Sequence, residues 1–281
     1  MSPAGGARVA GAGLSLRDAH LGELLKTPGT QVGWLEVVTE NLFSAPPRFI
    51  DGLSELAERY PLVLHGVGLN LGSSDPLDEQ YLDRAAAWAE RLGARWLSDH
   101  LCWSGVAGQN SHDLIPLPAR REVVDHCVRR IEQVQKHWGR TLVIENVSAY
   151  LRPRGGELSE WEFLSQVVEG SGCEILLDLN NLWVNAKNFG FDPLVYLEAI
   201  PLDRVRQAHL AGHEVWDGIR VDTHSRPICT EVWDLYRNFV ARAGPVPTAI
   251  EWDREIPALE VLLREARAID VILRGASDAV G

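Results

Sequence analysis

The chain has 281 residues, of which 46% are hydrophobic and 23% charged, and its formal net charge at pH 7 is −12. This composition is typical of a soluble globular protein, and the acidic balance argues against nucleic acid or an anionic membrane as the main partner, because both require a basic face. No apolar run approaches the roughly 20 residues of a membrane span, and the segment Met1–Leu16 lacks the long apolar core of a signal peptide. The 4 cysteines lie far apart with no CxxC spacing, which favours reduced thiols and a cytoplasmic location.

Short apolar runs alternate with longer amphipathic stretches along the whole chain. Continuous apolar strands that alternate with helices indicate parallel strands buried on both faces. Eight such units predict one (β/α)8 TIM barrel, a single domain over residues 1–281. A doubly wound sheet is the alternative, and the absence of a GxGxxG after the first run disfavours it. The predicted strands are Val9–Leu16, Gly33–Val38, Leu62–His65, Trp96–Asp99, Thr141–Glu145, Glu174–Asp178, Arg204–His209 and Val246–Glu251.

The stretches between these runs carry helix signals. In the stretch 75–94, Asp75 can cap the N-terminus, Pro76 suits the first turn, and Gly93 follows the end. The stretches 118–138 and 256–273 show apolar residues three and four positions apart, which predicts two further amphipathic helices.

Six of the eight predicted strands end on a histidine, a glutamate or an aspartate: His65, His100, Glu145, Asp178, His209 and Glu251. In a barrel all these ends open on the face that carries active sites. Asp222 and His224, in the loop after the seventh strand, are two residues apart, so an extended chain points both to the same side. We expect these eight side chains to converge on one mouth.

Taken singly, each of these residues has an ordinary structural explanation. A carboxylate at a strand end is usually a helix cap or a partner of arginine, and a histidine there is more often a hydrogen-bonded scaffold residue. Eight together are harder to explain in this way, because the carboxylates of Glu145, Asp178, Asp222 and Glu251 would repel one another unless cations neutralise them. About four negative charges match two divalent ions, or a cluster of two to three ions. The convergence predicts a multinuclear metal centre.

The ligand types narrow the choice of metal. No cysteine joins the set, which disfavours structural zinc and iron–sulfur clusters. Imidazole and carboxylate ligands suit iron, manganese or zinc, and iron is favoured where open positions serve oxygen chemistry.

Eight stretches of the chain form a recognisable set of motifs: "HGVGLNLGSSDPL", "SDHLCWSG", "HDLIPLP", "IENVSAYL", "LLDLNNLWVNAKNFGFDP", "HLAGHE", "DTHSRPI" and "AIEWDREIP". Together they resemble the motifs of the DUF692 family of multinuclear non-haem iron-dependent oxidases, which includes the methanobactin biosynthesis oxidase. The resemblance covers residues 33–256 and implies a TIM barrel that holds two or three irons and uses dioxygen to modify a residue, often cysteine, of a ribosomally made precursor peptide. It also implies a separately encoded partner that presents the peptide, and we expect no room for a fused recognition domain after the last predicted helix.

The resemblance also assigns roles to residues. His65, His100 and Glu145 would hold one iron, and Glu145 or a neighbouring carboxylate would bridge to a second. The second iron would be held, in some division, by Asp178, His209, Asp222, His224 and Glu251. Asn181 matches a position that binds or supports the cluster. Relatives often read EVHxEN in the second strand, whereas here Val38 replaces the histidine. Glu36 is then open to two interpretations, a salt bridge at the barrel rim or a role at the centre; Glu40 and Asn41 also remain.

Several loop residues are weaker candidates. Trp103, Trp183 and Trp216 could wall the mouth, although packing under a loop is the commoner role of such residues. The Asn-rich stretch 180–192 fits either a lid over the peptide or a solvated connector. His112 and Asp113 could lie near the mouth, and Cys102 is expected to be a packing residue rather than a nucleophile.

Other functions use similar barrels. A zinc endonuclease is disfavoured by the acidic charge. A two-metal sugar isomerase would need a catalytic lysine, and Lys187 is the only lysine after Lys136. A non-enzymatic scaffold would not need so many charged groups in one mouth.

Overall fold

The computed structural model describes residues 8–27 and 30–280. Residues 1–7, which begin the segment considered above as a signal peptide, lie outside the described residues. Among the described residues, eight parallel strands close into a barrel in the order β1-β12-β9-β8-β7-β4-β3-β2. Its strands are β1 Ala12–Ser15, β2 Trp34–Val38, β3 Leu62–His65, β4 Leu97–His100, β7 Leu142–Glu145, β8 Glu174–Asp178, β9 Val205–Leu210 and β12 Thr248–Ile250. The (β/α)8 prediction is confirmed, and closure excludes the doubly wound alternative.

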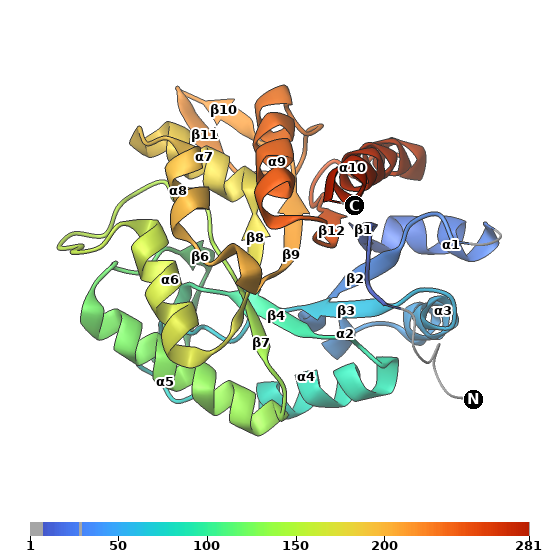
Figure 1. The fold of residues 1–281 in the computed structure, drawn as a ribbon. Coiled ribbons are helices and arrows are strands. Elements are labelled where there is room, and N and C mark those ends of the chain that lie inside the picture. The colour runs from blue at the N-terminus through green and yellow to red at the C-terminus, as the bar shows by residue number, and fades with distance from the viewer. Residues whose placement is uncertain (1–7, 28–29, 281) are drawn as a thin grey trace.

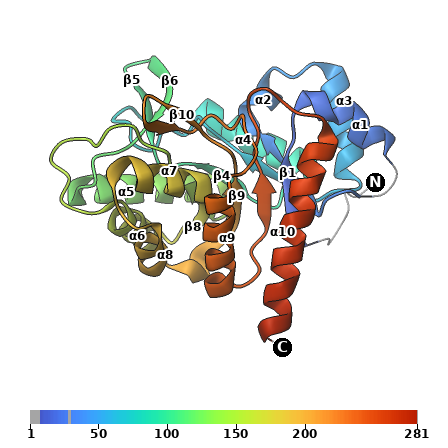
Figure 2. The same cartoon turned by 90° about the horizontal axis from the view of Figure 1, so that it is seen from above.

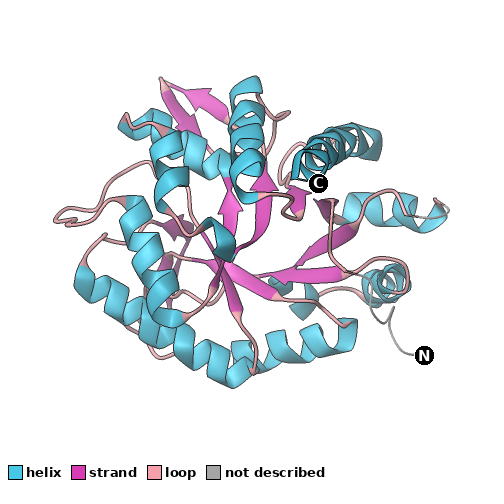
Figure 3. Ribbon diagram, in the orientation of Figure 1, coloured by secondary structure: helices cyan, strands magenta, loops and turns pink. Residues whose placement is uncertain are grey.

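Helices surround the barrel (Figures 1 and 3). They are α1 Asp18–Lys26, α2 Thr39–Phe43, α3 Pro47–Ala57, α4 Glu79–Leu92, α5 Arg121–Trp138, α6 Glu160–Ser171, α7 Leu179–Phe189, α8 Pro193–Ala199, the 3-10 turn η1 Leu202–Arg204, α9 Thr230–Ala243 and α10 Leu259–Val280. None of the described helices combines the length and apolar composition needed to cross a bilayer.

The start of α4 differs from the prediction. Asp78, not Asp75, caps the helix, and its carboxylate accepts hydrogen bonds from the amides of Gln80 at 2.9 Å and Tyr81 at 3.1 Å. The carbonyl of Asp75 instead accepts a bond from Arg130 at 2.6 Å, which holds that residue in the loop before the helix. Gly93 ends α4 in the left-handed conformation, as predicted.

Two hairpins interrupt the barrel pattern, β5 Trp103–Val106 with β6 Gln109–Ile115, and β10 Glu214–Trp216 with β11 Ile219–Val221. They follow β4 and β9, and Figure 2 shows β5, β6 and β10 at one end of the molecule. Because they follow the carboxyl ends of their strands, they lie on the face where the candidate ligands were expected. Neither hairpin was predicted from the hydrophobic pattern of the sequence.

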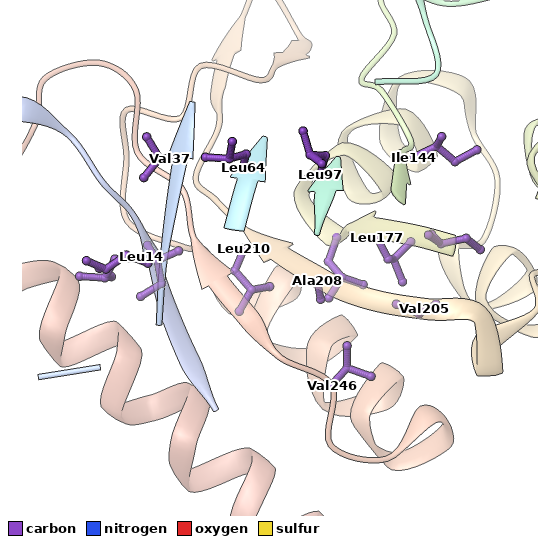
Figure 4. Close-up of a cluster of buried hydrophobic side chains, with 14 of the residues drawn as sticks. Leu14, Val37, Leu64, Leu97, Ile144, Leu177, Val205, Ala208, Leu210 and Val246 are labelled. Carbon is purple, nitrogen blue, oxygen red and sulfur yellow. The ribbon is translucent and has the colours of Figure 1, made fainter. Parts of the chain in front are cut away.

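Successive side chains of each strand face opposite sides of the barrel wall, so the apolar residues form two layers, one outside the wall and one inside it. Side chains facing outward pack beneath the helices, and Figure 4 shows a group of them: Leu14, Val37, Leu64, Leu97, Ile144, Leu177, Val205, Ala208, Leu210 and Val246. The inward-facing side chains form a separate interior layer of Val9, Trp34, Val63, Trp96, Val143, Leu176 and Ala249. This interior layer fills the barrel, so any site must lie above it, toward the carboxyl ends of the strands.

Candidate metal centre

The candidate ligands point inward because of their register with the interior layer. Successive side chains in a strand face opposite sides, so the residue two positions beyond an inward one also faces inward. Val63 is followed in this way by His65, and Val143 by Glu145. Leu176, likewise, is followed by Asp178. The same spacing relates Trp34 to Glu36 and Ala249 to Glu251. A layer of polar groups therefore lies directly above the apolar interior layer.

His65, His100 and Glu145 form the first group. The Nε2 atoms of His65 and His100 lie 3.1 Å and 3.2 Å from Glu145 Oε2. The opposite nitrogen of each ring is anchored, because His65 Nδ1 bonds to Ser98 Oγ at 2.9 Å and His100 Nδ1 to the carbonyl of Gly66 at 3.0 Å. These outer bonds orient both rings so that Nε2 faces Glu145, which is how proteins commonly orient histidine ligands.

His209 is the centre of the second group. Its Nδ1 lies 3.1 Å from Glu251 Oε2, 3.8 Å from Glu145 Oε1 and 4.0 Å from Asp178 Oδ2. One ligand atom from each of these four residues lies within 4.8 Å of the others, and all four residues are buried. Glu145 belongs to both groups, with one oxygen directed to each. The structure thus brings together the six strand-end residues predicted to converge.

Asp178 is both the cap of a helix and a candidate metal ligand. Its Oδ1 accepts the amide of Asn181 at 2.6 Å and so caps helix α7. Its Oδ2 is buried with no hydrogen-bond partner among the described residues. Asn181 lies beside the site, with its Nδ2 3.5 Å from Glu145 Oε1. One oxygen of Asp178 is therefore used by the fold, and the other is left for a ligand.

Asp222 and His224 lie at the outer edge of the site. His224 Nε2 is 2.7 Å from Asp222 Oδ1, and its Nδ1 is 2.9 Å from Asp253 Oδ2 and 3.5 Å from Glu251 Oε2. His224 has a φ of +46°, which a residue with a side chain rarely adopts. Its carbonyl accepts the amide of Asp253 at 2.8 Å, and this bond helps to hold the strained backbone in place.

The electrostatics show how this many buried charges coexist. Burial opposes the charged form of Glu145, but the facing His100 and His65 outweigh it and hold the pKa of Glu145 below its ordinary value. Burial would likewise lower the pKa of His65, but Glu145 raises it to about 9. Burial, reinforced by Glu145, raises the pKa of Asp178 well above its usual range. Protons balance the carboxylates in this arrangement, and a divalent cation could take their place.

Unpartnered atoms provide the structural test of whether the site fits metal. Buried polar atoms nearly always have a hydrogen-bond partner, so a cluster without one requires an explanation. Five buried atoms of the predicted set complete no hydrogen bond among the described residues: Glu145 Oε2, Asp178 Oδ2, Asn181 Oδ1, His209 Nδ1 and His224 Nε2. Three of them instead face an oppositely charged group without the alignment of a hydrogen bond: Glu145 Oε2 faces His65 at 3.1 Å, His209 Nδ1 faces Glu251 at 3.1 Å and His224 Nε2 faces Asp222 at 2.7 Å. All five are atom types that bind metal ions. The donor set fits a metal centre.

Glu36 supports the site from below. Its Oε2 lies 3.0 Å from His209 Nε2 and accepts a hydrogen bond from Gln207 Nε2 at 2.5 Å. Gln207 is itself held by Trp96 Nε1, 2.8 Å from its Oε1. Glu36 is fully buried, so the interpretation as a salt bridge at the barrel rim is wrong. It orients His209 so that Nδ1 faces the second group.

Glu36→Gln is expected to weaken metal binding by about 10–100-fold, the usual cost of losing the outer partner of a histidine ligand. The substitution keeps the shape of the side chain and removes the charge that faces His209. Competition with a chelator of known affinity measures the change. Glu174→Gln is the matched control. Glu174 begins β8, at the end of the strand away from the candidate ligand Asp178, so this variant should bind metal like the wild type. Equal affinities for the two variants would contradict the role assigned to Glu36.

The site opens into a mouth cavity of about 480 Å³. His65, His100, Glu145, Asn181, Asp222, His224 and Glu251 line it. Apolar residues form much of the remaining wall, and Tyr150, Leu151 and Val67 are exposed at its edge. Trp103, Trp183 and Trp216 are not among the residues that line the cavity, which disfavours the less favoured of the two interpretations, that they wall it. Trp103 and Trp216 lie in the hairpins, and the Trp183 ring packs under Lys187 Nζ.

A protein-family model matches the chain over most of its length. The model for the RiPP precursor modification enzymes MbnB/TglH/ChrH matches residues 11–274. The chain belongs to this family. Among its relatives, a UPF0276 protein of Acaryochloris marina is 44% identical over 266 residues, 94% of this chain and 95% of its own. UPF0276 proteins of Anaeromyxobacter (44%, 92% of both chains) and Caulobacter vibrioides (42%, 91% of both) are similar at comparable length.

Solved structures share the fold of this MbnB/TglH/ChrH family member. Endonuclease IV from Thermus thermophilus superposes with a TM-score of 0.56 at 18% identity, over 95% of this chain and 99% of its own. A D-tagatose 3-epimerase-like protein gives a TM-score of 0.61 at 16% identity, over 96% of this chain and 100% of its own. At these identities the likeness shows the barrel and nothing about the reaction.

Two charged residues at the site of this family member were not identified from the sequence. Asp253 bonds His224, and Arg17 contacts the carboxylates of both Asp253 and Glu251. Asp253 follows Glu251 by two residues, the same spacing as between Asp222 and His224. This spacing is the sequence signal that indicates Asp253 as a further candidate. Arg17 gave no such signal, because it lies 234 positions from Glu251.

The remaining loop predictions have mixed outcomes. The stretch 180–192 is mostly the packed helix α7, with Leu179, Leu182 and Val184 buried, so neither a lid nor a solvated connector describes it. His112 is exposed and belongs to none of the groups above, whereas Asp113 lines the mouth cavity. Cys102 is fully buried, and burial raises the pKa of its thiol well above the usual value, which confirms a packing role.

Proposed function

We propose that the protein is a multinuclear non-haem iron oxidase that uses dioxygen to modify a residue, most often cysteine, of a ribosomally made precursor peptide. The observation that carries this proposal is the set of five buried ligand atoms that complete no hydrogen bond, at the mouth of a barrel from a family of precursor modification enzymes. Two or three iron ions would neutralise carboxylates that otherwise rely on protonated histidines.

The two groups define where the ions would be held. His65, His100 and Glu145 would hold one ion, and Glu145 would share a second with Asp178, His209 and Glu251. Asp222 and His224, with Asp253 and the edge of Glu251, form a position for a further ligand or ion, and Asn181 would bind or support the cluster. Bound iron would supply the activation of dioxygen and a lowered pKa for a substrate thiol.

The protein's own contribution is to position the substrate and exclude water. Val38, Val147 and Ile115 give the mouth cavity apolar walls close to the candidate ligands. An extended peptide segment could place one side chain into this cavity of about 480 Å³. The exposed Tyr150 and Leu151 would then contact the peptide residues on either side of the inserted one. The apolar lining of the cavity would also keep water away from reactive groups of the substrate.

The nuclease alternative fits this mouth poorly. The described residues that line it include no lysine or arginine, whereas Asp113, Asp222, Glu251 and Asp253 contribute carboxylates. A phosphate backbone would be repelled, because nucleic-acid binding depends on basic contacts. The isomerase alternative lacks its lysine, since Lys187 Nζ lies 4.1 Å from the centre of the Trp183 ring and outside the cavity.

A separately encoded partner that binds the precursor belongs to the same proposal. Ordering a flexible peptide costs roughly 2–5 kcal/mol of the gross interaction energy, which a few contacts in one mouth do not offset. A partner that binds the leader raises the local concentration of the reactive segment.

The test combines metal analysis with a turnover assay. Protein purified without added metal should contain about two to three equivalents of iron, because two divalent ions balance about four carboxylate charges and a bridging hydroxide would allow a third ion. Mass spectrometry should detect oxygen-dependent change of a cysteine in the full precursor when the partner is present, and little change of free cysteine or of the core peptide alone. The precursor is sought as a short cysteine-containing reading frame next to the gene.

Anaerobic incubation and a Cys→Ser precursor are the controls for this assay. Stoichiometric zinc with no iron, even after anaerobic reconstitution with iron, would contradict the oxidase and favour the nuclease. Turnover of the core peptide alone at the rate of the full precursor with the partner would contradict the need for a partner.

A further inference from the structure

A second cavity, here called the side pocket, lies next to the mouth cavity. Its volume is about 420 Å³, within the range of small-ligand sites. It shares the lining residues Pro116, Val147 and Leu151 with the mouth cavity. The remaining lining comes mainly from the loop after β7, the start of α6, the end of α7 and α8. A group in the side pocket would therefore lie beside a residue in the mouth.

Five aromatic side chains line the side pocket, and three of them pack against one another. The Trp161 ring lies 5.4 Å from that of Phe191 and 6.1 Å from that of Tyr196, centre to centre, in tilted and edge-on arrangements. Aromatic pairs favour these geometries, and they fix the shape of the pocket before anything binds. Phe163 and Phe189 add two more rings to the lining. An aromatic guest would find complementary faces and edges.

The polar end of the side pocket has unused hydrogen-bonding capacity. Both oxygens of Glu160 accept from the same amide nitrogen, Asn185 Nδ2, at 3.1 Å. A carboxylate offers about four lone-pair positions, so acceptor capacity remains. The buried hydroxyl of Tyr196 faces Glu160 but is not aligned for a hydrogen bond with it. The metal centre accounts for none of these groups.

The same amide links the side pocket to the mouth. Asn185 Nδ2 also donates to the carbonyl of Val147 at 3.0 Å, and its Oδ1 accepts the amide of Ala149 at 2.7 Å. The segment from Val147 to Ala149 forms part of the wall between the cavities. A ligand bonded to Glu160 would thus contact the residues that hold this wall.

The charged side chains that line the side pocket, Arg152 and Glu160, limit which ligands can bind there. The guanidinium of Arg152 stacks 4.6 Å from the centre of the Phe189 ring, within the lining, and repels a second cation. Burial raises the pKa of Glu160 to about 7, and above that pH its carboxylate repels an anion. A neutral group with a hydrogen-bond donor avoids both penalties and uses the spare acceptor of Glu160.

We propose that the side pocket binds an aromatic group with one hydrogen-bond donor, an indole or a phenol. Its source is a tryptophan or tyrosine side chain of the peptide close in sequence to the residue in the mouth, and this choice of source rests on the proposed function. The pocket would then select which residue of a precursor is positioned at the metal centre.

The first arm of the test uses p-cresol and indole as probes, with 4-methylanisole and 1-methylindole as matched analogues that lack the donor. Ligand-observed NMR titration of the wild-type protein should show binding of both probes. The analogues should bind about tenfold more weakly, because they leave the acceptor unpaired. Failure of both probes to bind would overturn the proposal.

Two variants locate the binding. Glu160→Gln should remove the preference for donors, because its carbonyl would face Asn185 and its amide would face the guest. Gly156→Trp should block all probes, since Gly156 lines the pocket and a Cβ there meets only the Ala119 carbonyl oxygen at 3.8 Å, an ordinary contact. Glu169→Gln and Gly22→Trp are controls on exposed helix positions and should bind like the wild type. Unchanged binding by both pocket variants would overturn the assignment.

The second arm identifies the source of the aromatic group. N-acetyl-Ser-Ala-Trp-amide should displace p-cresol, and the matched peptide ending in Leu-amide should not. Serine in place of cysteine removes any role of oxidation, so this result stands even if the proposed reaction fails. Binding of p-cresol without displacement by the Trp peptide would overturn the peptide source and assign the pocket to a free small molecule.

Discussion

Glu145→Ala is expected to empty the metal centre and abolish turnover while the barrel remains folded. Glu145 contributes one oxygen to each ligand group, so its loss affects both at once. Iron content should fall below about a tenth of the wild-type value and turnover by at least about a hundredfold, since losing even an outer partner costs about 10–100-fold. The fold should persist because the interior layer and the helix contacts do not involve this carboxylate.

Elemental analysis, circular dichroism and the precursor assay measure these three quantities. Glu265→Gln is a suitable control, because Glu265 is a half-buried carboxylate on α10 that bonds the amide of Ile228 outside the barrel. It should retain iron and activity. Wild-type iron content in Glu145→Ala would show that the two groups do not share a ligand.

Gly212→Ala is expected to lower turnover by about a hundredfold although Gly212 is not a candidate ligand. A Cβ at this position would collide with the backbone carbonyl of Arg226, closer than real Cβ atoms approach. Gly212 follows β9, which carries His209, and Arg226 follows His224. The collision forces one of these two segments to shift, and we expect the shift to reach His209 or His224, where a misplacement of about 1 Å can cost about a hundredfold in rate.

The rate with full precursor and the iron content together test this variant. Gly275→Ala is the matched control, because a Cβ at this helical position meets nothing within 4 Å. It should keep full activity, and the exchange of glycine for alanine in a helix is stabilising. Wild-type turnover in Gly212→Ala would show that the loop carrying His224 can shift without affecting the reaction.

The strand-end residues could be predicted because two local rules act together. Apolar runs mark the strands, and the closed topology brings all their carboxyl ends to one face. His65, Glu145 and Asp178 needed no knowledge of three-dimensional contacts for this reason. Helix α7 was missed because asparagines resemble a loop, whereas the cap at Asp178 and the buried Leu179 favour a helix.

The supporting contacts could not be predicted, because they join residues distant in the chain. Glu36 lies 173 positions from His209, and nothing near either residue indicates that they meet. The positions of the tryptophans could not be predicted for a related reason. Trp103 and Trp216 lie in hairpins, whose direction depends on turn geometry rather than on the hydrophobic pattern of the barrel.

The chain order of the ligands has a consequence for biosynthesis. Under the proposed function, His65, His100 and Glu145 lie on β3, β4 and β7, which are adjacent in the sheet and all precede α6. A nascent chain synthesised as far as α6 already carries the complete first group. The second group needs Glu251, just after the last strand, so it forms only when β12 pairs with β9 and β1. If the protein holds two ions as proposed, the ligands of the first are complete in the chain before those of the second, and the second group forms only once the barrel closes.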